Sequence, residues 1–590
     1  MRSGFSPLGR TLLLALLPTM LLACAGTGSV QRGAAPSVAL PSPYVPADWP
    51  LLTETVSVAA PHAMVSSVHP RASEVGAAIL RKGGNAVDAA VAVGFALAVV
   101  HPSAGNLGGG GFMVIRLRDG SVYALDYRET APEAATKDMY VDSLGLVSER
   151  SVTGHLAVGV PGSVAGLAEA QRRFGTLPLA TVMEPAVRLA EDGVVLDEAR
   201  SRSLQYAAPR LRRFQGSRDQ FLLPSGDAPP PGTLFVQADL AHTLRAIADS
   251  GPAVFYEGTI ADLIVAEIAR GGGLISKRDL ATYRAVWREP VEIHYRGHRI
   301  YSMPPSSSGG VTMAEILNIL EGFDPLPPFG SSAQVHLAAE AMRRAFTDRN
   351  HFLGDPDFVD MPLERLTSKS YAAEQRRTID PRRATPSGTL TPGIVEGDHT
   401  THYSVVDAEG NAVSVTTTIN SGYGSAATVQ AAGFLLNNEM DDFTGAPGQP
   451  NQYGLVQGEA NAIAPRKRML SAMTPSIVLD RDGRLLMVVG TPGGPTIITT
   501  VAQVISNVVD HGMSLAEAIA APRIHHQALP DLIAYERRGL RGDVVADLMR
   551  RGHRVEERRG FSGEVAGIMR TADGWVGVSD PRSGGGSAGF

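Results

Sequence analysis

Cysteine is almost missing from this sequence: Cys24 is the only one among 590 residues. A single cysteine excludes an intrachain disulfide framework and a zinc site built from several thiolates. Histidine does not replace it, because His525 and His526 are adjacent and on a strand would point to opposite faces. His69 and His101 each precede a proline and have no ligand partner at metal spacing. The sequence therefore predicts no metal site.

Long runs of one charge are also missing. The net charge is -6, charged residues make up 19% of the chain, and basic and acidic residues are interspersed. Without a basic stripe the chain is not predicted to bind nucleic acid. No internal repeat indicates a solenoid or propeller. With 44% hydrophobic residues, the chain is predicted to be globular, with one large domain or more than one.

The most apolar stretch near the start, residues 11–23, is too short to span a membrane, which takes about 20 apolar residues. Arg2 and Arg10 precede it, and Cys24 ends a segment that resembles a bacterial lipobox. Residues 1–23 are therefore predicted to be a lipoprotein-type signal peptide, with a lipid on Cys24 that anchors the protein in a membrane. Residues 24–54, rich in Ala, Gly, Ser and Pro, are predicted to be a flexible tether. The expected location is the periplasm or outer membrane; an ordinary signal peptide with an incidental cysteine is the alternative.

The rest of the chain has the pattern of a mixed α/β protein. A helix that is apolar all round is expected over residues 88–100 and is predicted to be buried in the core. Residues 332–350 show apolar residues at helical spacing and are predicted to form an amphipathic helix. Another helix is expected over residues 72–82, and strands are expected over residues 65–68, 476–480 and 485–489.

Residues 384–399 are rich in Pro, Gly, Ser and Thr and lack periodicity, which is typical of an exposed linker that can be cut. Two β-branched segments follow, residues 402–407 and 411–417, and predict a β-hairpin. Thr400 lies where the linker meets the hairpin. If the chain is cut before Thr400, its new α-amino group, with an ordinary pKa of about 7.7–8.0, can act as the base for its own hydroxyl. In the precursor the same hydroxyl can attack the carbonyl of His399.

Several separated segments resemble motifs of the gamma-glutamyltranspeptidase (glutathione hydrolase) family, in the same order and over nearly the whole chain from about Val56 to Arg582. They are residues 106–112 (NLGGGGF), 126–129 (DYRE), 400–407 (TTHYSVVD), 436–443 (LNNEMDDF) and 491–494 (TPGG). The resemblance implies an α+β fold of the N-terminal nucleophile hydrolase type, a four-layer αββα sandwich. It also implies cleavage into a large subunit, residues 55–399, and a small catalytic subunit, residues 400–590, which form a heterodimer.

The resemblance further implies roles for residues that bind a γ-glutamyl group. Arg128 matches the arginine that holds the α-carboxylate, a task that suits a planar guanidinium. Glu439, Asp442 and Asn420 match the residues that hold the α-amino group. One departure concerns Ser471, since the family usually has two serines where this chain has Ser471-Ala472.

The remaining implied roles concern the reaction itself. Thr418 matches the residue that supports the nucleophile's hydroxyl. Gly493 and Gly494 match the pair whose N–H groups stabilise the oxyanion, and glycine lets the backbone approach closely. Residues 447–458, which include Tyr453, match a loop that covers the site in some members of the family.

The leading hypothesis is a self-processing enzyme that cleaves γ-glutamyl amides such as glutathione and transfers the glutamyl group to water or an amine acceptor. Neither a metal nor an organic cofactor is expected. An acylase acting on glutaryl-type amides or on poly-γ-glutamate is the alternative, and Ala472 is the residue that supports it. A surface lipoprotein that keeps only the scaffold is a third possibility, which the intact motifs oppose.

Overall fold

The computed structural model describes residues 42–53, 55–388, 400–446 and 448–590. The predicted signal peptide, Cys24, residues 25–41 and 54 of the tether, and most of the linker lie outside the described residues. No helix among the residues described is long and apolar enough to cross a membrane.

Two seven-stranded sheets form the centre of the fold, and every neighbouring pair of strands within them is antiparallel. Sheet 1 has the order β1 (Val56–Ala60), β18 (Gly574–Ser579), β17 (Ala566–Thr571), β13 (Leu485–Val489), β12 (Ser476–Leu479), β9 (His298–Ser302) and β8 (Val291–Tyr295). Sheet 2 has the order β19 (Gly586–Gly589), β2 (Met64–Ser67), β10 (Thr400–Val406), β11 (Ala412–Thr418), β3 (Gly110–Arg116), β4 (Val122–Tyr127) and β7 (Val286–Arg288).

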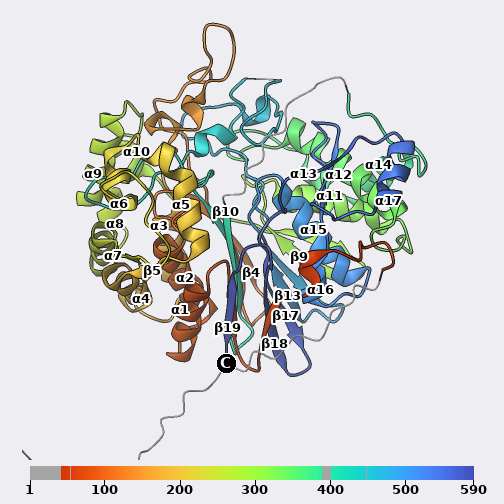
Figure 1. The fold of residues 1–590 in the computed structure, drawn as a ribbon, viewed down its shortest axis with the longest axis horizontal. Helices are drawn as coiled ribbons and strands as arrows, with labels where there is room; N and C mark the ends of the chain where they lie inside the picture. The colour runs from red at the N-terminus through yellow and green to blue at the C-terminus, as the bar shows by residue number, and fades with distance from the viewer. Residues whose placement is uncertain (1–41, 54, 389–399, 447) are drawn as a thin grey trace, which may run out of the picture. The chain divides into compact units, whose positions relative to one another are not determined.

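The two sheets face each other and helices cover their outer faces (Figure 1). Strands β10 and β11 of sheet 2 contact β13 of sheet 1, and β10 also contacts β17. Helices α1 (Pro70–Arg81), α2 (Ala86–Val100) and α3 (Ser163–Phe174) pack on sheet 2. Helices α11 (Gly309–Glu321) and α16 (Leu515–Ala520) pack on sheet 1, with α12 (Ser332–Phe352) and α15 (Thr496–Val509) against α11. These layers confirm the predicted four-layer αββα sandwich.

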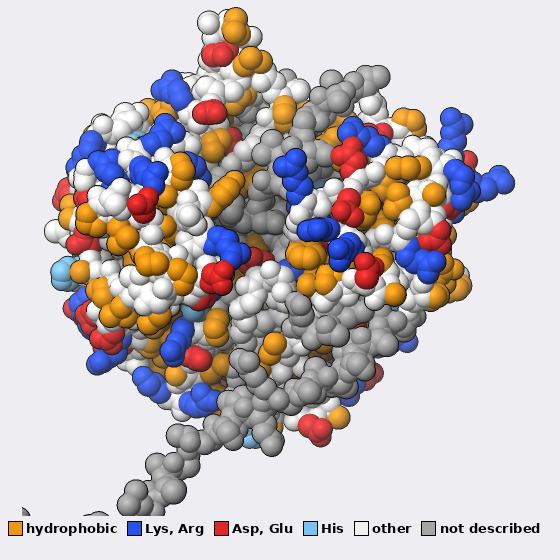
Figure 2. Space-filling view, in the orientation of Figure 1, with side chains coloured by type: hydrophobic (Ala, Val, Ile, Leu, Met, Phe, Trp, Pro, Cys, Tyr) orange, Lys and Arg blue, Asp and Glu red, His pale blue; other side chains and the backbone are white. Residues whose placement is uncertain are grey.

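The other α-helices and strands of the described chain lie outside these sets. They are α4 (Leu179–Asp192), α5 (Glu198–Leu211), α6 (Gln215–Phe221), α7 (Ala238–Ser250), α8 (Ala253–Tyr256), α9 (Thr259–Arg270), α10 (Lys277–Thr282), α13 (Leu363–Leu366), α14 (Lys369–Arg377), α17 (Gly542–Arg550), β5 (Val194–Val195), β6 (Leu234–Phe235), β14 (Ile524–His525), β15 (Ile533–Tyr535) and β16 (Val555–Glu557). On the face drawn in Figure 2, basic and acidic side chains both occur and are interspersed over much of the surface.

The elements predicted from the sequence are found close to their expected bounds. Every residue of α2 is buried, as its apolar composition predicts, and a capping box between Asn85 and Asp88 fixes its start. The helix predicted over residues 332–350 is α12, which begins after its N-cap Ser331. Residues 335–346 are all buried, so this part of the helix lacks the solvent-exposed face that the amphipathic pattern predicted. The strand predicted over residues 485–489 is β13, with the same bounds.

Strand β10 places Thr400 between the two sheets. Side chains alternate along a strand, so Thr400 and Ser404 point to one face and Tyr403 to the other. The Ser404 hydroxyl donates to the carbonyl of Ala566 in sheet 1 at 3.0 Å, whereas Tyr403 joins the apolar cluster that contains α2. Thr400 therefore faces the interior of the sandwich at the end of its strand.

Candidate active site

Thr400 begins β10 and lies opposite Thr418, the last residue of β11. Its hydroxyl donates to the Thr418 hydroxyl oxygen at 3.4 Å, and that oxygen also accepts the backbone N–H of Asn420 at 2.7 Å. Both threonines are buried. Asn420 has a φ of 72°, which turns the chain away from the strand just after Thr418. The predicted nucleophile and its predicted support therefore lie side by side.

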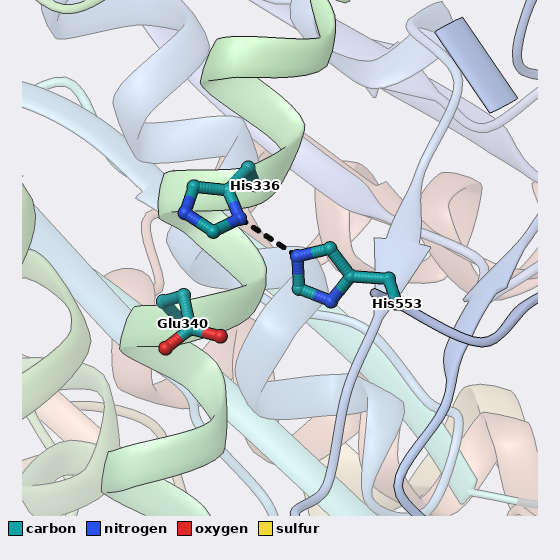
Figure 3. Close-up of side chains that lie close together, drawn as sticks. All are labelled: His336, Glu340 and His553. Atoms are coloured by element: carbon teal, nitrogen blue, oxygen red, sulfur yellow. Dashed lines mark hydrogen bonds between the residues drawn. The ribbon is translucent and has the colours of Figure 1, made fainter. Parts of the chain in front are cut away.

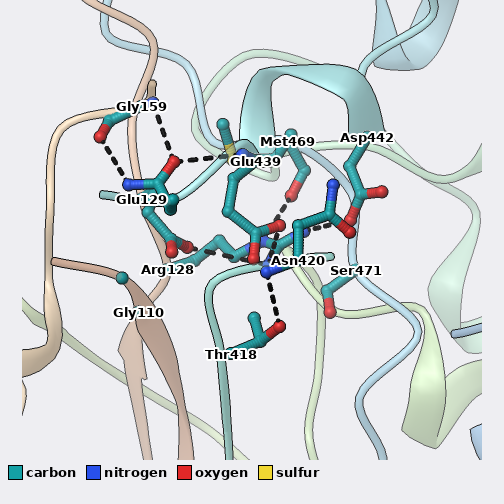
Figure 4. Close-up of polar contacts among 12 residues, drawn as sticks. Gly110, Arg128, Glu129, Gly159, Thr418, Asn420, Glu439, Asp442, Met469 and Ser471 are labelled. Atoms are coloured by element: carbon teal, nitrogen blue, oxygen red, sulfur yellow. Dashed lines mark hydrogen bonds and ion pairs between the residues drawn. The ribbon is translucent and has the colours of Figure 1, made fainter. Parts of the chain in front are cut away.

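Four charged side chains gather beside Thr418 (Figure 4): Arg128, Glu129 and Glu439 are buried and Asp442 is partly buried. The Nη1 atom of Arg128 lies 2.7 Å from Oε2 of Glu439 and 3.6 Å from Oε2 of Glu129. Its Nη2 atom lies 2.5 Å from Oδ2 of Asp442. The residues predicted to hold the two opposite charges of a substrate are thus paired with each other in this structure.

Backbone contacts fix both sides of this cluster. Arg128 directly follows β4; its carbonyl accepts the Tyr283 hydroxyl at 2.9 Å, and its Nε donates to the carbonyl of Met469 at 3.3 Å. Glu439 and Asp442 lie on a single 3-10 turn, η4 (Glu439–Asp442). The side chain of Asn437 accepts the Glu439 N–H at 3.0 Å and donates to the carbonyls of Gly108 and Gly159, both at 2.8 Å. The asparagine-rich motif therefore ties η4 to the first glycine-rich motif.

Three carboxylates surround the single guanidinium of Arg128, and the pKa of each carboxylate is raised. Burial raises the pKa of Glu129 to about 8, against the opposing effect of Arg128. Burial likewise raises the pKa of Glu439 and of Asp442, again opposed by Arg128. Burial disfavours the charged guanidinium of Arg128, but Glu439 and Asp442 outweigh it and raise the pKa of Arg128. Apart from these contacts with Arg128, both oxygens of Glu129 and of Glu439 are buried without a hydrogen bond from the described residues. A cationic ligand group would relieve this excess of carboxylates.

Gly493 and Gly494 form a turn directly before α15. Their φ angles, 134° and 53°, lie in the region that favours glycine. Their carbonyls accept the N–H groups of Thr496 and Ile497 at 3.1 Å. Neither glycine N–H has an acceptor among the contacts of the described residues. Because buried backbone N–H groups are rarely left unpaired, this turn can offer donors to a developing oxyanion.

Tyr453 covers this turn. Its hydroxyl donates to the carbonyl of Asn420 at 3.0 Å. A Cβ atom placed on Gly494 would lie 3.3 Å from the Tyr453 ring, so ring and turn are in contact. The predicted covering loop thus lies over the pocket through Tyr453; Pro447 at its start is outside the described residues.

One pocket unites nearly all the predicted site residues. It is lined by Arg128, Thr400, Thr418, Asn420, Glu439, Asp442, Tyr453, Ser471, Ala472 and Gly494, together with Arg349. Gly493 lines the neighbouring cavity, beside Tyr453. Within the pocket the Ser471 hydroxyl accepts the Met473 N–H at 3.1 Å, and Ala472 has no side-chain donor. Sequence reasoning gave no role to Glu129 or Arg349; the first follows Arg128 directly in its motif, but no local signal marks the second.

A second cluster of titratable side chains lies away from this pocket. His336, Glu340 and His553 are buried, and their ligand atoms lie within 4.8 Å of one another (Figure 3). Protein groups already satisfy these atoms. The rings of His336 and His553 share a 2.7 Å hydrogen bond. Glu340 accepts from Arg344 at 2.6 Å and from the Thr385 N–H at 3.0 Å. The cluster is compatible with a metal ion only if these contacts are given up.

The chain is similar in sequence and in structure to known proteins. A family model described as gamma-glutamyltranspeptidase matches residues 72–590. A glutathione hydrolase proenzyme from Escherichia coli (strain K12) is 49% identical over 533 residues, which cover 89% of this chain and 91% of that protein. The crystal structure of a cephalosporin acylase from Bacillus halodurans superposes with a TM-score of 0.80 at 30% identity, covering 91% of this chain and 97% of that one. A Helicobacter pylori gamma-glutamyltranspeptidase chain gives a TM-score of 0.54 at 47% identity, covering 55% of this chain and 94% of that one.

Proposed function

The chain belongs to the gamma-glutamyltranspeptidase family, and from that premise we propose that Thr400 is its catalytic nucleophile. The protein is a γ-glutamyltransferase and glutathione hydrolase with the fold of the N-terminal nucleophile hydrolases. It cleaves γ-glutamyl amides and passes the glutamyl group to water or to an amine acceptor. It is made as a proenzyme and processed into two subunits. We place the cut between His399 and Thr400.

One observation carries the assignment of Thr400: its hydroxyl lies 3.4 Å from that of Thr418, in the same pocket as the oxyanion turn and the charge cluster. After cleavage the freed amine of Thr400 takes the hydroxyl proton as Oγ1 attacks the γ-carbonyl carbon. The N–H groups of Gly493 and Gly494 stabilise the oxyanion. Its collapse expels the leaving amine, which receives the proton, and leaves a threonyl ester. Water or an acceptor amine then attacks the ester carbonyl and gives a proton to the Thr400 amine. Collapse of the second oxyanion breaks the ester bond, and the Thr400 hydroxyl regains its proton.

Recognition of the donor uses the charge cluster. Arg128 binds the α-carboxylate with help from Ser471, and Glu439, Asp442 and Asn420 surround the α-ammonium. The excess of buried carboxylates over Arg128 supports this assignment, because an ammonium group supplies the missing positive charge.

Thr400→Ala tests the nucleophile. We expect a single uncut chain by intact mass and a loss of γ-glutamyl-p-nitroanilide turnover by more than about 10³-fold. Thr401→Val is the matched control, because Thr401 is also buried on β10 but its side chain points to the opposite face. A Thr400→Ala protein that still separates into two chains would rule out the assignment.

A second candidate is an acylase that acts on glutaryl-type amides or on poly-γ-glutamate, supported by the cephalosporin acylase from Bacillus halodurans, which has the same fold. Ala472 offers no donor to the substrate carboxylate, but γ-glutamyl and glutaryl groups both carry that carboxylate, so this residue alone favours neither substrate. Turnover of γ-glutamyl-p-nitroanilide and glutaryl-p-nitroanilide decides between them. Preference for the glutaryl compound, which lacks the α-amino group, would favour the acylase.

For the N-terminal region we propose a lipid on Cys24 that anchors the enzyme in a membrane, in the periplasm or at the outer membrane. The apolar stretch that ends at Cys24 and the tether composition of residues 24–54 support this proposal. The full chain, expressed in a host that processes lipoproteins, should partition into detergent. Cys24→Ser should leave the enzyme active but move it to the aqueous phase. Equal partitioning of both proteins would contradict a lipid anchor.

A further inference from the structure

Arg349, on α12, is buried at 1% exposure and lines the active-site pocket. All of its hydrogen-bond acceptors are neutral. Its Nε donates to the Ser308 hydroxyl at 2.9 Å, and its Nη1 donates to the side-chain carbonyls of Asn350 at 2.9 Å and Gln457 at 3.0 Å. Nη2 has no partner among the contacts of the described residues. One edge of a buried guanidinium is therefore uncommitted.

This arginine differs from the other buried arginines of the described chain. The other five each lie within 4 Å of a carboxylate: Arg128 of Glu439, Arg343 of Asp531, Arg344 of Glu340, Arg468 of Asp126 and Arg523 of Asp580. Arg349 has no such partner among the described residues. Burial lowers its pKa to about 10, partly offset by Asp442. A buried cation without a counter-ion is costly, so its presence in a substrate pocket points to an anionic ligand group.

Arg128 cannot serve as the whole receptor for a carboxylate. Both of its terminal nitrogens already contact carboxylates, Nη1 with Glu439 and Nη2 with Asp442. The neighbouring position that would supply a second hydroxyl is Ala472, which lines the same pocket and has none. The pocket therefore needs another donor for a substrate carboxylate, and Arg349 is the remaining cation on its wall.

We propose that Arg349 is a specificity-determining residue that binds the α-carboxylate of the γ-glutamyl donor together with Arg128 and Ser471. The inference rests on the proposed function, since it presupposes a donor with that carboxylate. Arg349 stays protonated throughout and takes no part in bond making or breaking. Its contacts with Ser308 and Gln457 hold the guanidinium plane, which leaves the Nη2 edge to face the ligand.

Two substrates separate recognition of the carboxylate from a structural role. γ-Glutamyl-p-nitroanilide and 4-aminobutyryl-p-nitroanilide share the amide and the amino group, but only the first has the α-carboxylate. For Arg349→Gln we expect kcat/KM to fall about 10- to 150-fold on the first substrate, mainly through KM, and to change less than about threefold on the second. Equal losses on both substrates would overturn the proposal, because a displaced loop or helix would affect both alike.

If Arg349→Gln is not cleaved into two subunits, Arg349→Lys provides the same test. It keeps the charge but lacks the planar fork, so we expect a smaller loss, about 10-fold, again confined to the carboxylate-bearing substrate. Adding the missing hydroxyl by Ala472→Ser should recover part of the loss in either variant. A lysine variant that loses both activities equally, or neither, contradicts the role. Failure of the proposed function would instead be seen in the unmodified enzyme, as absent turnover of γ-glutamyl-p-nitroanilide.

Discussion

Arg128 and Glu439 are paired inside the pocket, with Nη1 and Oε2 separated by 2.7 Å and both side chains buried. A γ-glutamyl group must therefore bind by exchange of partners. The α-carboxylate of the substrate takes over part of the contact that Arg128 makes with Glu439. The α-ammonium of the substrate then supplies the positive charge that Glu439 has partly lost. Each buried charge keeps an opposite neighbour through the exchange, which avoids the cost of an unpaired ion.

Asp442→Asn tests this exchange. Without the charge on residue 442, the ammonium loses one of its carboxylates. We expect kcat/KM for γ-glutamyl-p-nitroanilide to fall about 10- to 150-fold, the value of a hydrogen bond to a charged group. Glutaryl-p-nitroanilide, which has no α-amino group, should be affected much less. Asp482→Asn, on an exposed surface ion pair, is the control. A loss of the same size on both substrates would contradict the assigned role.

Gly494→Ala tests the oxyanion turn. Gly494 has a φ of 53°, and an added Cβ would lie 3.3 Å from the Tyr453 ring. The turn must shift to accept the methyl group, and an oxyanion donor that is out of place costs about 10²- to 10³-fold in kcat. Gly120→Ala controls for backbone strain alone, since Gly120 also has a positive φ, 91°, and no atom within 4 Å of an added Cβ. Unchanged kcat in Gly494→Ala would exclude the turn as the oxyanion site.

Tyr453→Phe tests the covering loop. The substitution removes the hydroxyl that donates to the Asn420 carbonyl at 3.0 Å but keeps the ring over Gly494. A neutral hydrogen bond contributes about 0.5–1.5 kcal/mol, so we expect kcat/KM to fall about 2- to 12-fold. Tyr206→Phe, at an exposed position on α5, should have no effect. An unaltered Tyr453→Phe enzyme would show that this bond does not hold the loop closed.

Local patterns predicted the elements that carry the site. The β-branched residues after the linker specify a hairpin, and that hairpin aligns Thr400 with Thr418. The apolar composition of residues 88–100 specifies a buried helix, and α2 is buried throughout. Motif resemblance located the charged residues and the glycine turn, which the fold brings into one pocket. These features depend on neighbours in sequence or on matched motifs, so they could be predicted before the structure.

Other features depend on packing between distant segments. An arginine within residues 332–350 has the pattern of an ordinary polar position on an amphipathic helix, and only the packing of α12 against α11 and the covering loop buries Arg349. The pairing of Arg128 with Glu439 joins the residue that follows β4 to η4, more than 300 positions away in the chain. Neither relation has a local sequence signal.

The contact between His336 and His553 joins the large-subunit part of the chain to the small-subunit part. His336 Nε2 donates to the carbonyl of Asp380 at 2.9 Å, so its Nδ1 accepts from His553 Nε2 at 2.7 Å. His553 Nδ1 in turn faces Nη2 of Arg343 at 3.5 Å. All of these hydrogen bonds can form at once when His336 and His553 each carry one ring proton. Burial, together with the neighbouring His336 ring and the positive charge of Arg343, lowers the pKa of His553 to about 3, and burial also lowers the pKa of His336.

Lowering the pH should therefore weaken the contact between His336 and His553 and destabilise the folded protein. Between the ordinary histidine pKa of about 6.5 and the lowered value near 3, the unfolded chain binds a proton that the folded protein does not, so stability falls as pH falls. The slope is at most about 1.4 kcal/mol per pH unit for each such proton. His553→Gln keeps a donor for His336 but cannot be protonated, so its melting temperature should drop less than that of the unmodified enzyme between pH 7 and pH 4.5. His294→Gln, at an exposed position, should follow the unmodified enzyme. The same acid-induced drop in His553→Gln and in the unmodified enzyme would show that this pair does not respond to pH.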